Sequence, residues 1–375
     1  MKALDDWLQV ELLGVRNVTP TVREFRLAFR ERVPAAPGSH LNVRVMIGDR
    51  PDKRSYSVVS ATDDGEVSIA VKLLTESRGG SRHMWSLQPG SRLHVTRPSS
   101  GFELSRDAPQ YLLLAGGIGV TPLVSMASAL ARRNANVRMV YATRSREEFA
   151  YLPLLQELLG ARLEVFPADE GRVLDLAREV AALAVGAELY MCGPIGLMDA
   201  VRAEWLHLGL PLSKLRFETF GSSGHHAATA FTVKIPRLNM EVIVREDRSM
   251  LDALAEAGVA VLSECRRGEC GLCALEIIGS DAEIDHRDVF FASAEHARNK
   301  KICACVSRAA GGTVVVEPAW RGDPDLGVTE VLPSCTPANG VQAQTECIES
   351  IANFIADAAP SARAQPRPST PSGRP

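Results

Sequence analysis

The chain has 375 residues, of which 46% are hydrophobic and 23% are charged, and its formal net charge is −3. This length is too great for one ordinary hydrophobic core, so the sequence predicts two or three domains of a globular protein. The small net charge gives no reason to expect nucleic acid or an anionic membrane as a partner.

The chain also lacks the usual signs of export. Asp5 and Asp6 stand where a signal peptide needs an apolar segment, and the longest apolar stretch, residues 111–120, contains glycines and is far shorter than a bilayer span. Eight cysteines are too few for a disulfide scaffold in a chain of this size. We therefore expect a cytoplasmic protein.

Residues 1–106 are predicted to form an antiparallel β-barrel. Apolar residues alternate with polar ones along this segment, as in 25–29 and 41–47, and glycines and prolines separate the alternating runs. Period two with such punctuation is typical of short antiparallel strands. Residues 80–87 are the helical exception, and Ser81 is the predicted N-cap.

Two motifs in this first domain suit a flavin. In R-S-Y-S, residues 54–57, Tyr56 offers a flat partner for the ring and Arg54 offers charge-assisted hydrogen bonds to a phosphate. In R-G-G-S, residues 78–81, two glycines precede the predicted helix, where backbone N–H groups can hold a phosphate. The first motif alone fits a purely structural strand equally well, whereas the two together favour flavin binding.

Residues 107–221 are predicted to form an α/β domain with a parallel sheet. Short apolar runs near residues 111–115, 137–141, 163–166, 188–191 and 215–217 alternate with helical patterns. Such runs are typical of strands that are covered on both faces.

Two segments of this second domain follow predicted strands. G-G-I-G-V-T-P, residues 116–122, leads into a helix, and its glycines would let the backbone approach a pyrophosphate. It is not the usual G-x-G-x-x-G fingerprint, and a structural glycine turn is the alternative. M-C-G-P, residues 191–194, ends a later strand, so Cys192 is expected beside whatever the glycine loop holds. The alternative is that Cys192 is only a small buried thiol.

A linker, residues 222–230, precedes a third domain, residues 231–322, that contains the most specific pattern in the chain. Cys265, Cys270 and Cys273 have the spacing C-x4-C-x2-C, and Cys305 follows. This is the plant-type pattern for a [2Fe–2S] cluster, with Cys303 as a rival fourth ligand. Structural zinc is the alternative, because clustered thiolates also bind zinc. Residues 323–375 are rich in Pro, Ser and Ala and are predicted to be a largely disordered tail.

These motifs, in this order, resemble those of the phthalate dioxygenase reductase and vanillate O-demethylase reductase family over about residues 8–323. The resemblance implies a flavin barrel, a nicotinamide-binding α/β domain and an α+β plant-type ferredoxin domain of the β-grasp type. It also implies FMN and NADH as the bound molecules, and a segment of the C-V-S-R type that makes Cys305 the fourth ligand rather than Cys303.

The resemblance further assigns roles to individual residues. The FMN phosphate is expected at Arg54, Arg78, Gly80 and Ser81. The flavin ring is expected at Tyr56 and Ser57, with Phe220 on or beside it. The NADH pyrophosphate is expected at Gly116, Gly117, Gly119 and Thr121, and the nicotinamide at Cys192.

Three redox sites in one chain predict one function. NADH gives up two electrons together and the cluster accepts one at a time, so the flavin must stand between them. We expect an NADH-dependent reductase that serves the terminal component of a Rieske-type aromatic dioxygenase or O-demethylase. The alternative acceptors are a diiron hydroxylase, a cytochrome P450 or a separate ferredoxin, and the alternative of a different class is a non-redox zinc-binding module.

The reductase is expected to be a monomer that docks transiently through a small polar surface. Arg266 and Arg267, in the cluster loop, are candidates to meet acidic residues of the partner, a solvated basic pair being the alternative. Arg144 and Ser145 leave NADPH open, because they suit a 2′-phosphate.

Overall fold

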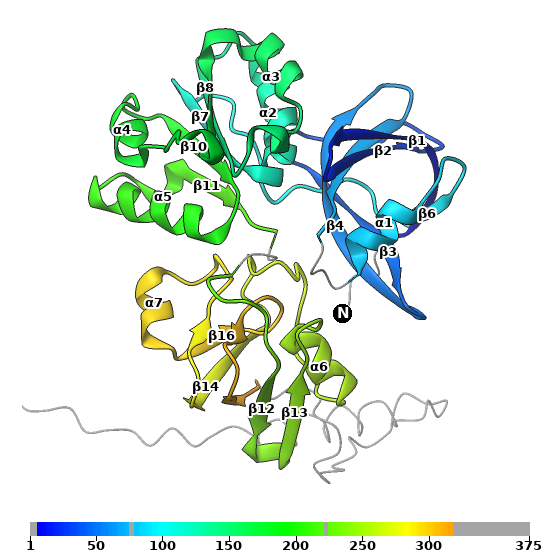
Figure 1. Cartoon of the computed structure of the whole chain (residues 1–375), viewed down its shortest axis with the longest axis vertical. Helices are drawn as coiled ribbons and strands as arrows, with labels where there is room; N and C mark the ends of the chain where they lie inside the picture. The colour runs from blue at the N-terminus through cyan, green and yellow to red at the C-terminus, as the bar shows by residue number, and fades with distance from the viewer. Residues whose placement is uncertain (1–5, 75–78, 221–223, 319–375) are drawn as a thin grey trace, which may run out of the picture. The chain divides into compact units, whose positions relative to one another are not determined.

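The computed structural model describes residues 6–74, 79–220 and 224–318 (Figure 1). These residues belong to one compact unit, Met1–Pro324. Arg78 and the predicted tail therefore lie outside the described residues. Among the helices that are described, none is long and apolar enough to cross a membrane.

The first part of the chain is a closed antiparallel barrel with the strand order β1-β2-β5-β4-β3-β6. Its strands are β1 (Leu8–Thr19), β2 (Val22–Ala28), β3 (His40–Ile47), β4 (Arg50–Ala61), β5 (Glu66–Lys72) and β6 (Arg92–Val95). The alternating apolar side chains, such as Leu41 and Val43, fill the interior and are fully buried. The predicted barrel is thus confirmed.

The helix of the barrel, α1 (Gly80–Ser86), differs from the prediction at its start. Its N-cap is Gly79, in a left-handed conformation with φ 95°. Ser81 lies in the first turn instead, where its Oγ accepts a hydrogen bond of 3.3 Å from the amide of Leu74. The left-handed cap position favours glycine over serine, because glycine has no Cβ to clash there.

The second part is a parallel sheet with the strand order β11-β10-β7-β8-β9. The strands are β7 (Tyr111–Gly116), β8 (Val137–Thr143), β9 (Leu163–Pro167), β10 (Glu188–Cys192) and β11 (Leu215–Glu218). The helices are α2 (Val120–Arg132), α3 (Leu152–Leu159), α4 (Leu176–Ala181) and α5 (Ile195–His207). Leu113 of β7 belongs to the core that includes α2 and α3, whereas Leu112 and Leu114 belong to the core that includes α4 and α5. The sheet is therefore covered on both faces, as predicted.

The strand order of this sheet creates a place for a ligand. The chain crosses to β8 on one side of β7 and later to β10 on the other side, so the connections after β7 and β10 diverge. Ligands of open parallel sheets bind in the crevice at such a point, beyond the carboxyl ends of the strands. Gly116 and Cys192 are the last residues of these two strands.

The third part is a mixed sheet with the order β13-β12-β18-β14-β16, accompanied by a two-stranded sheet of β15 and β17. The strands are β12 (Phe231–Ile235), β13 (Met240–Val244), β14 (Ala274–Ser280), β15 (Ile284–Asp285), β16 (Lys301–Cys303), β17 (Arg308–Ala309) and β18 (Thr313–Glu317), and the helices are α6 (Met250–Glu256) and α7 (Ser293–Arg298). Short 3-10 turns occur at η1 (Gly117–Gly119), η2 (Arg146–Glu148), η3 (Gly160–Arg162), η4 (Ala168–Glu170), η5 (Leu212–Lys214) and η6 (Pro236–Leu238). The cysteine-rich loop lies between α6 and β14.

Candidate functional site

The loop between α6 and β14 directs backbone N–H groups at a cysteine. The amides of Arg267 and Glu269 both point at the Sγ of Cys265, at 3.4 Å. Cys270 and Cys273 follow in the same loop, and all three are free thiols. Backbone N–H groups that converge on sulfur are what an anionic iron–sulfur cluster needs for neutralisation.

Two glycines let this loop close tightly. Gly268 has φ +78°, and a Cβ on it would lie 2.6 Å from Cγ2 of Val306. Gly271 has φ +70°, and a Cβ on it would overlap the ring of Phe290. Since both the backbone angle and the space exclude a side chain, these glycines are required for the loop.

Two further thiols, those of Cys303 and Cys305, lie near Cys273 and differ in what surrounds them. Cys305 lines a cavity together with Cys265, whereas the side chain of Cys303 is fully buried. This arrangement is compatible with Cys305 as the proposed fourth ligand.

The predicted flavin residues line one cavity together with this cysteine. Arg54, Tyr56, Ser57, Gly80, Ser81, Thr121, Phe220 and Cys305 are all on its wall. The cavity thus joins the barrel motif to a predicted cluster ligand. Arg78 cannot be placed, because it lies outside the described residues.

The polar groups of this cavity fit a flavin phosphate and ring. Arg54 Nη2 and Ser57 Oγ are buried and have no hydrogen-bond partner among the described residues. Arg54 Nη1 donates to Asp52 Oδ2 at 2.6 Å. A Cβ on Gly80 would lie 2.7 Å from Arg54 Nε, so the absence of a side chain lets the guanidinium pack against the start of α1. Burial raises the pKa of the Tyr56 hydroxyl, so this flat ring stays neutral.

The glycine loop after β7 packs against the turn after β10. A Cβ on Gly116 would lie 2.6 Å from Cδ of Pro194, and a Cβ on Gly119 would overlap the carbonyl oxygen of Cys192. Gly117, with φ +54°, has open space where its side chain would be. The four residues predicted to hold the pyrophosphate therefore differ in role: Gly116 and Gly119 permit close packing, Gly117 faces open space, and Thr121 lines the flavin-side cavity.

Cys192 is a neutral thiol at the end of β10. It is completely buried, and burial, together with the carboxylates of Glu218 and Glu269, raises the pKa of its thiol. It pairs in register with Ala115 of β7 and with Glu218 of β11. The structure thus places Cys192 directly beside the glycine loop, where the sequence predicted it.

Comparisons with known proteins agree with this architecture. Three family models match in succession: the oxidoreductase FAD-binding domain over residues 9–104, the N-terminal domain of the DmmA-like subunit of dimethylamine monooxygenase over 96–215, and the 2Fe-2S iron-sulfur cluster binding domain over 233–310. The carnitine monooxygenase reductase subunit of Escherichia coli (strain K12) is 32% identical, over 82% of this chain and 98% of that protein. The toluene-4-sulfonate monooxygenase system reductase subunit TsaB1 of Comamonas testosteroni is 33% identical, over 82% and 98%. The structure of phthalate dioxygenase reductase is 29% identical, with a TM-score of 0.67, over 84% of this chain and 98% of that one.

The chain belongs to the family of oxygenase reductase subunits. It is an oxidoreductase with a flavin-binding barrel and a [2Fe–2S] domain, and it passes electrons to a terminal oxygenase component. The match over residues 233–310 decides between the cluster and the zinc alternative in favour of the cluster.

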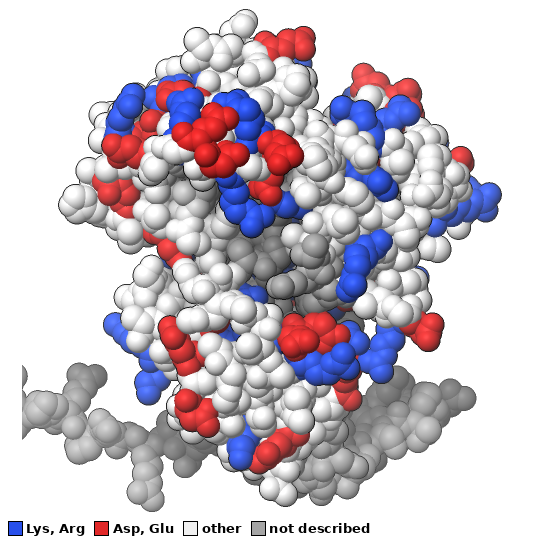
Figure 2. Space-filling model, viewed as in Figure 1, with Lys and Arg blue, Asp and Glu red and all other residues white. Residues whose placement is uncertain are grey.

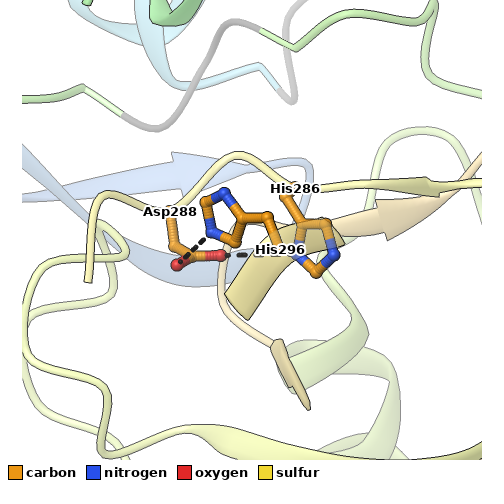
Figure 3. Close-up of side chains that lie close together, drawn as sticks. All are labelled: His286, Asp288 and His296. Carbon is orange, nitrogen blue, oxygen red and sulfur yellow. Dashed lines mark hydrogen bonds and ion pairs between the residues drawn. The ribbon is translucent and has the colours of Figure 1, made fainter. Parts of the chain in front are cut away.

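In this reductase, three buried or half-buried side chains, those of His286, Asp288 and His296, lie close together (Figure 3). Asp288 is fully buried, and it accepts hydrogen bonds from the Phe291 amide at 3.1 Å, from His296 Nε2 at 3.1 Å and from Ser307 Oγ at 2.9 Å. Burial alone would raise the pKa of Asp288, but the nearby His286 ring, whose Nδ1 lies 3.9 Å from Oδ1, and the hydrogen bonds from His296 and Phe291 outweigh burial and lower it.

Two histidines and a carboxylate are also a ligand set that metal ions favour. Here, however, the rings of His286 and His296 are stacked, with centroids 4.4 Å apart and an angle of 14° between their planes. The nitrogen lone pairs lie in the ring planes, so two nearly parallel rings cannot both direct a lone pair at one ion. The group is therefore a hydrogen-bonded support. It ties the segment after Cys305, through Ser307, to the loop at Gly268, whose carbonyl accepts from the amides of Val289 and Phe290.

The two arginines of the cluster loop both have acidic partners within the chain, and they differ in exposure. Arg267 is only 12% exposed and donates to Glu218 at 2.7 Å. Arg266 forms an ion pair with Asp252 of α6. The Arg266 side chain is 36% exposed, whereas Arg267 is directed at the carboxylates of Glu218 and Glu269, which are 2% and 22% exposed.

Proposed function

We propose that this reductase takes electrons from NADH through FMN and a [2Fe–2S] cluster held by Cys265, Cys270, Cys273 and Cys305. The terminal component of a Rieske-type aromatic dioxygenase or O-demethylase is the proposed acceptor. One observation carries the proposed route: Arg54, Tyr56 and Ser57 share a cavity with Cys305. A flavin in that cavity would be a direct neighbour of the cluster.

The residues of the chain bind and align the redox groups and perform no acid–base chemistry on a substrate. When bound, the flavin supplies the conversion of a two-electron delivery into single-electron steps. Arg54 and Ser57 offer unused hydrogen-bond donors to it, and Tyr56 offers a neutral ring. Cys192, the proposed neighbour of the nicotinamide, is a neutral thiol that other residues cover fully, so we propose that it supports the wall of the nicotinamide site from within. The alignment of two reactants in this way supplies much of a rate enhancement.

The proposal of NADH rather than NADPH rests on the family resemblance. Arg144, after β8, is 83% exposed, and its Nη2 lies 3.2 Å from Glu148 Oε1, while Lys72 Nζ lies 3.3 Å from the same oxygen. Two cations share this one carboxylate, so the local charge does not disfavour a 2′-phosphate, and the bleaching rates with the two nucleotides decide between them.

The exposed edge of the cluster loop supports docking of the oxygenase there. Leu272, between two predicted ligands, is 47% exposed, and Phe290, which packs on Gly271, is 48% exposed. Figure 2 shows positive and negative side chains interspersed on the face in view. We therefore propose a small contact with an apolar centre, rather than the polar surface that the sequence suggested.

Cofactor analysis tests the proposal most directly. The purified protein is denatured, the released flavin is identified by mass spectrometry, and iron and acid-labile sulfide are measured on the same sample. We expect FMN with two irons and two sulfides per chain, the stoichiometry of this cluster type. Release of FAD would contradict the proposal of FMN. Faster anaerobic bleaching of the flavin by NADPH than by NADH would contradict the proposal of NADH.

The docking surface has its own test. Leu272→Asp is expected to weaken electron transfer to the oxygenase and to leave ferricyanide reduction unchanged. Ile243→Asp is the matched control, because Ile243 is 70% exposed on β13, outside the cluster loop. Equal effects of the two variants on oxygenase turnover would contradict docking at the loop.

A further inference from the structure

A buried ion-pair junction connects the parallel sheet to the cluster loop. Arg267 Nη1 donates to Glu218 Oε1 at 2.7 Å, and Arg267 Nη2 lies 2.9 Å from Glu269 Oε2. Glu269 Oε1 in turn accepts from the amide of Thr219 at 3.2 Å. Glu218 and Thr219 come from the end of β11, whereas Arg267 and Glu269 come from the loop that holds the cluster ligands.

The junction is shielded from water. The side chains of Glu218, Arg267 and Glu269 are 2%, 12% and 22% exposed. Burial is the main reason that the pKa of Glu218 is raised to about 7, and Glu269 adds to this rise, while Arg267 opposes it. Two carboxylates this close in a dry site repel each other, so the guanidinium between them is what makes the arrangement stable.

A contact between the barrel and the third part of the chain is of a different kind. Arg50 of β4 pairs with Glu256 of α6 at 2.8 Å, but these side chains are 65% and 48% exposed. Exposed ion pairs contribute little, because water and salt screen them. A buried pair responds strongly when one partner is removed, because the other charge is left unpaired.

We propose that Arg267 is a positioning residue that latches the cluster loop onto the end of β11. By bridging Glu218 and Glu269, it holds the loop beside Cys192 and keeps Cys305 on the wall of the flavin cavity. The cluster then stays next to the flavin throughout turnover. The effect of Arg267 on the rate of cluster reduction rests on the proposed function. The bridge from Arg267 to Glu218 and Glu269 does not depend on it.

The test compares two arginines of the same loop in the full-length, cluster-loaded protein. Arg267→Met removes the bridge, and Arg266→Met is the matched control, because Arg266 pairs with Asp252 inside the third domain. Arg267→Lys keeps a positive charge but cannot bridge two carboxylates with a planar fork. Iron content and the visible spectrum confirm that each variant holds its cluster and flavin.

Amide hydrogen exchange tests the bridge formed by Arg267 in the absence of turnover. The Thr219 amide, which donates to Glu269, is expected to exchange about 100-fold faster in Arg267→Met, and Arg267→Lys is expected to restore part of the protection. Arg266→Met is expected to match the wild type. Equal exchange at Thr219 in the two methionine variants would overturn the latch.

Rapid mixing with NADH tests whether the bridge affects the rate of electron transfer from the flavin to the cluster. In Arg267→Met, flavin bleaching is expected to change little, while the following cluster reduction slows by about tenfold or more, since misplacement of redox partners is costly in rate. Faster exchange at Thr219 with unchanged cluster reduction would overturn the positioning role. Failure of NADH to bleach the wild-type flavin would instead overturn the proposed function, and the exchange experiment would still decide the latch.

Discussion

Gly119→Ala tests whether the packing of the glycine loop against the turn after β10 matters for hydride transfer. Gly119 has φ −62° and ψ −7°, a conformation that alanine adopts without strain. The cost of the substitution is therefore steric. The new Cβ would overlap the carbonyl oxygen of Cys192 and lie 2.8 Å from the amide nitrogen of Gly193. Both are backbone atoms, so they cannot rotate away as a side chain can.

The size of the effect follows from the displacement that this contact requires. Ordinary Cβ contacts begin at 3.4 Å, so the two segments must separate by about 1 Å, and overpacking of this kind lowers the free energy of unfolding by about 1–3 kcal/mol. A misplacement of about 1 Å between reacting groups lowers the rate by about 100-fold. We therefore expect flavin bleaching by NADH to fall by about that factor while the flavin remains bound.

Gly196→Ala is the control for this experiment. Gly196 lies in the first turn of α5, and a Cβ there would meet nothing within 4 Å. Alanine in a helix is favoured over glycine by about 1 kcal/mol, so this variant is expected to be as stable as the wild type or more so. Anaerobic rapid mixing with NADH and urea unfolding are measured for both. If Gly119→Ala bleaches as fast as Gly196→Ala, the close approach of Gly119 to Cys192 has no role in aligning the nicotinamide.

Three further predictions concern the cluster, the tail and pH. Cys270→Ser is expected to abolish electron transfer to cytochrome c and to leave a slower reduction of ferricyanide from the flavin; loss of both activities with the flavin retained would contradict separate redox stations. Removal of residues 331–375 is expected to leave NADH turnover largely unchanged, and a large drop would show that the tail takes part. Burial, followed by the charges of Arg267 and Lys53, lowers the pKa of His40 from 6.5 to about 3. Below pH 6.5 the His40 imidazole therefore binds a proton in the unfolded chain but stays neutral in the folded chain. This difference lowers the free energy of unfolding of the wild type by about 2 kcal/mol at pH 5 relative to pH 7. His40→Gln should show a smaller drop in unfolding midpoint between these pH values, and an identical drop would refute the shift.

The sequence by itself determined the class of each part and the order in which the parts occur. Period-two alternation in the first part and buried apolar runs in the second are local consequences of how strands expose their faces. The spacing of Cys265, Cys270 and Cys273 is equally local, because a short loop must bring these thiols to one cluster. For these features, the neighbours along the chain are also the partners in space.

Tertiary structure alone decided the roles of residues whose partners are distant along the chain. Arg267 seemed a surface residue in the sequence, but it lies 49 positions from Glu218 and pairs with it in a buried junction. Gly116 and Gly119 are predicted from the sequence to hold a pyrophosphate, and only the fold shows that they also pack against a turn more than 70 residues further along the chain. Asp288 acquires its support role only because Ser307 and His296 fold against it. Periodicity and spacing record which face a residue occupies; they do not record which distant group that face will meet, because this depends on how whole elements pack.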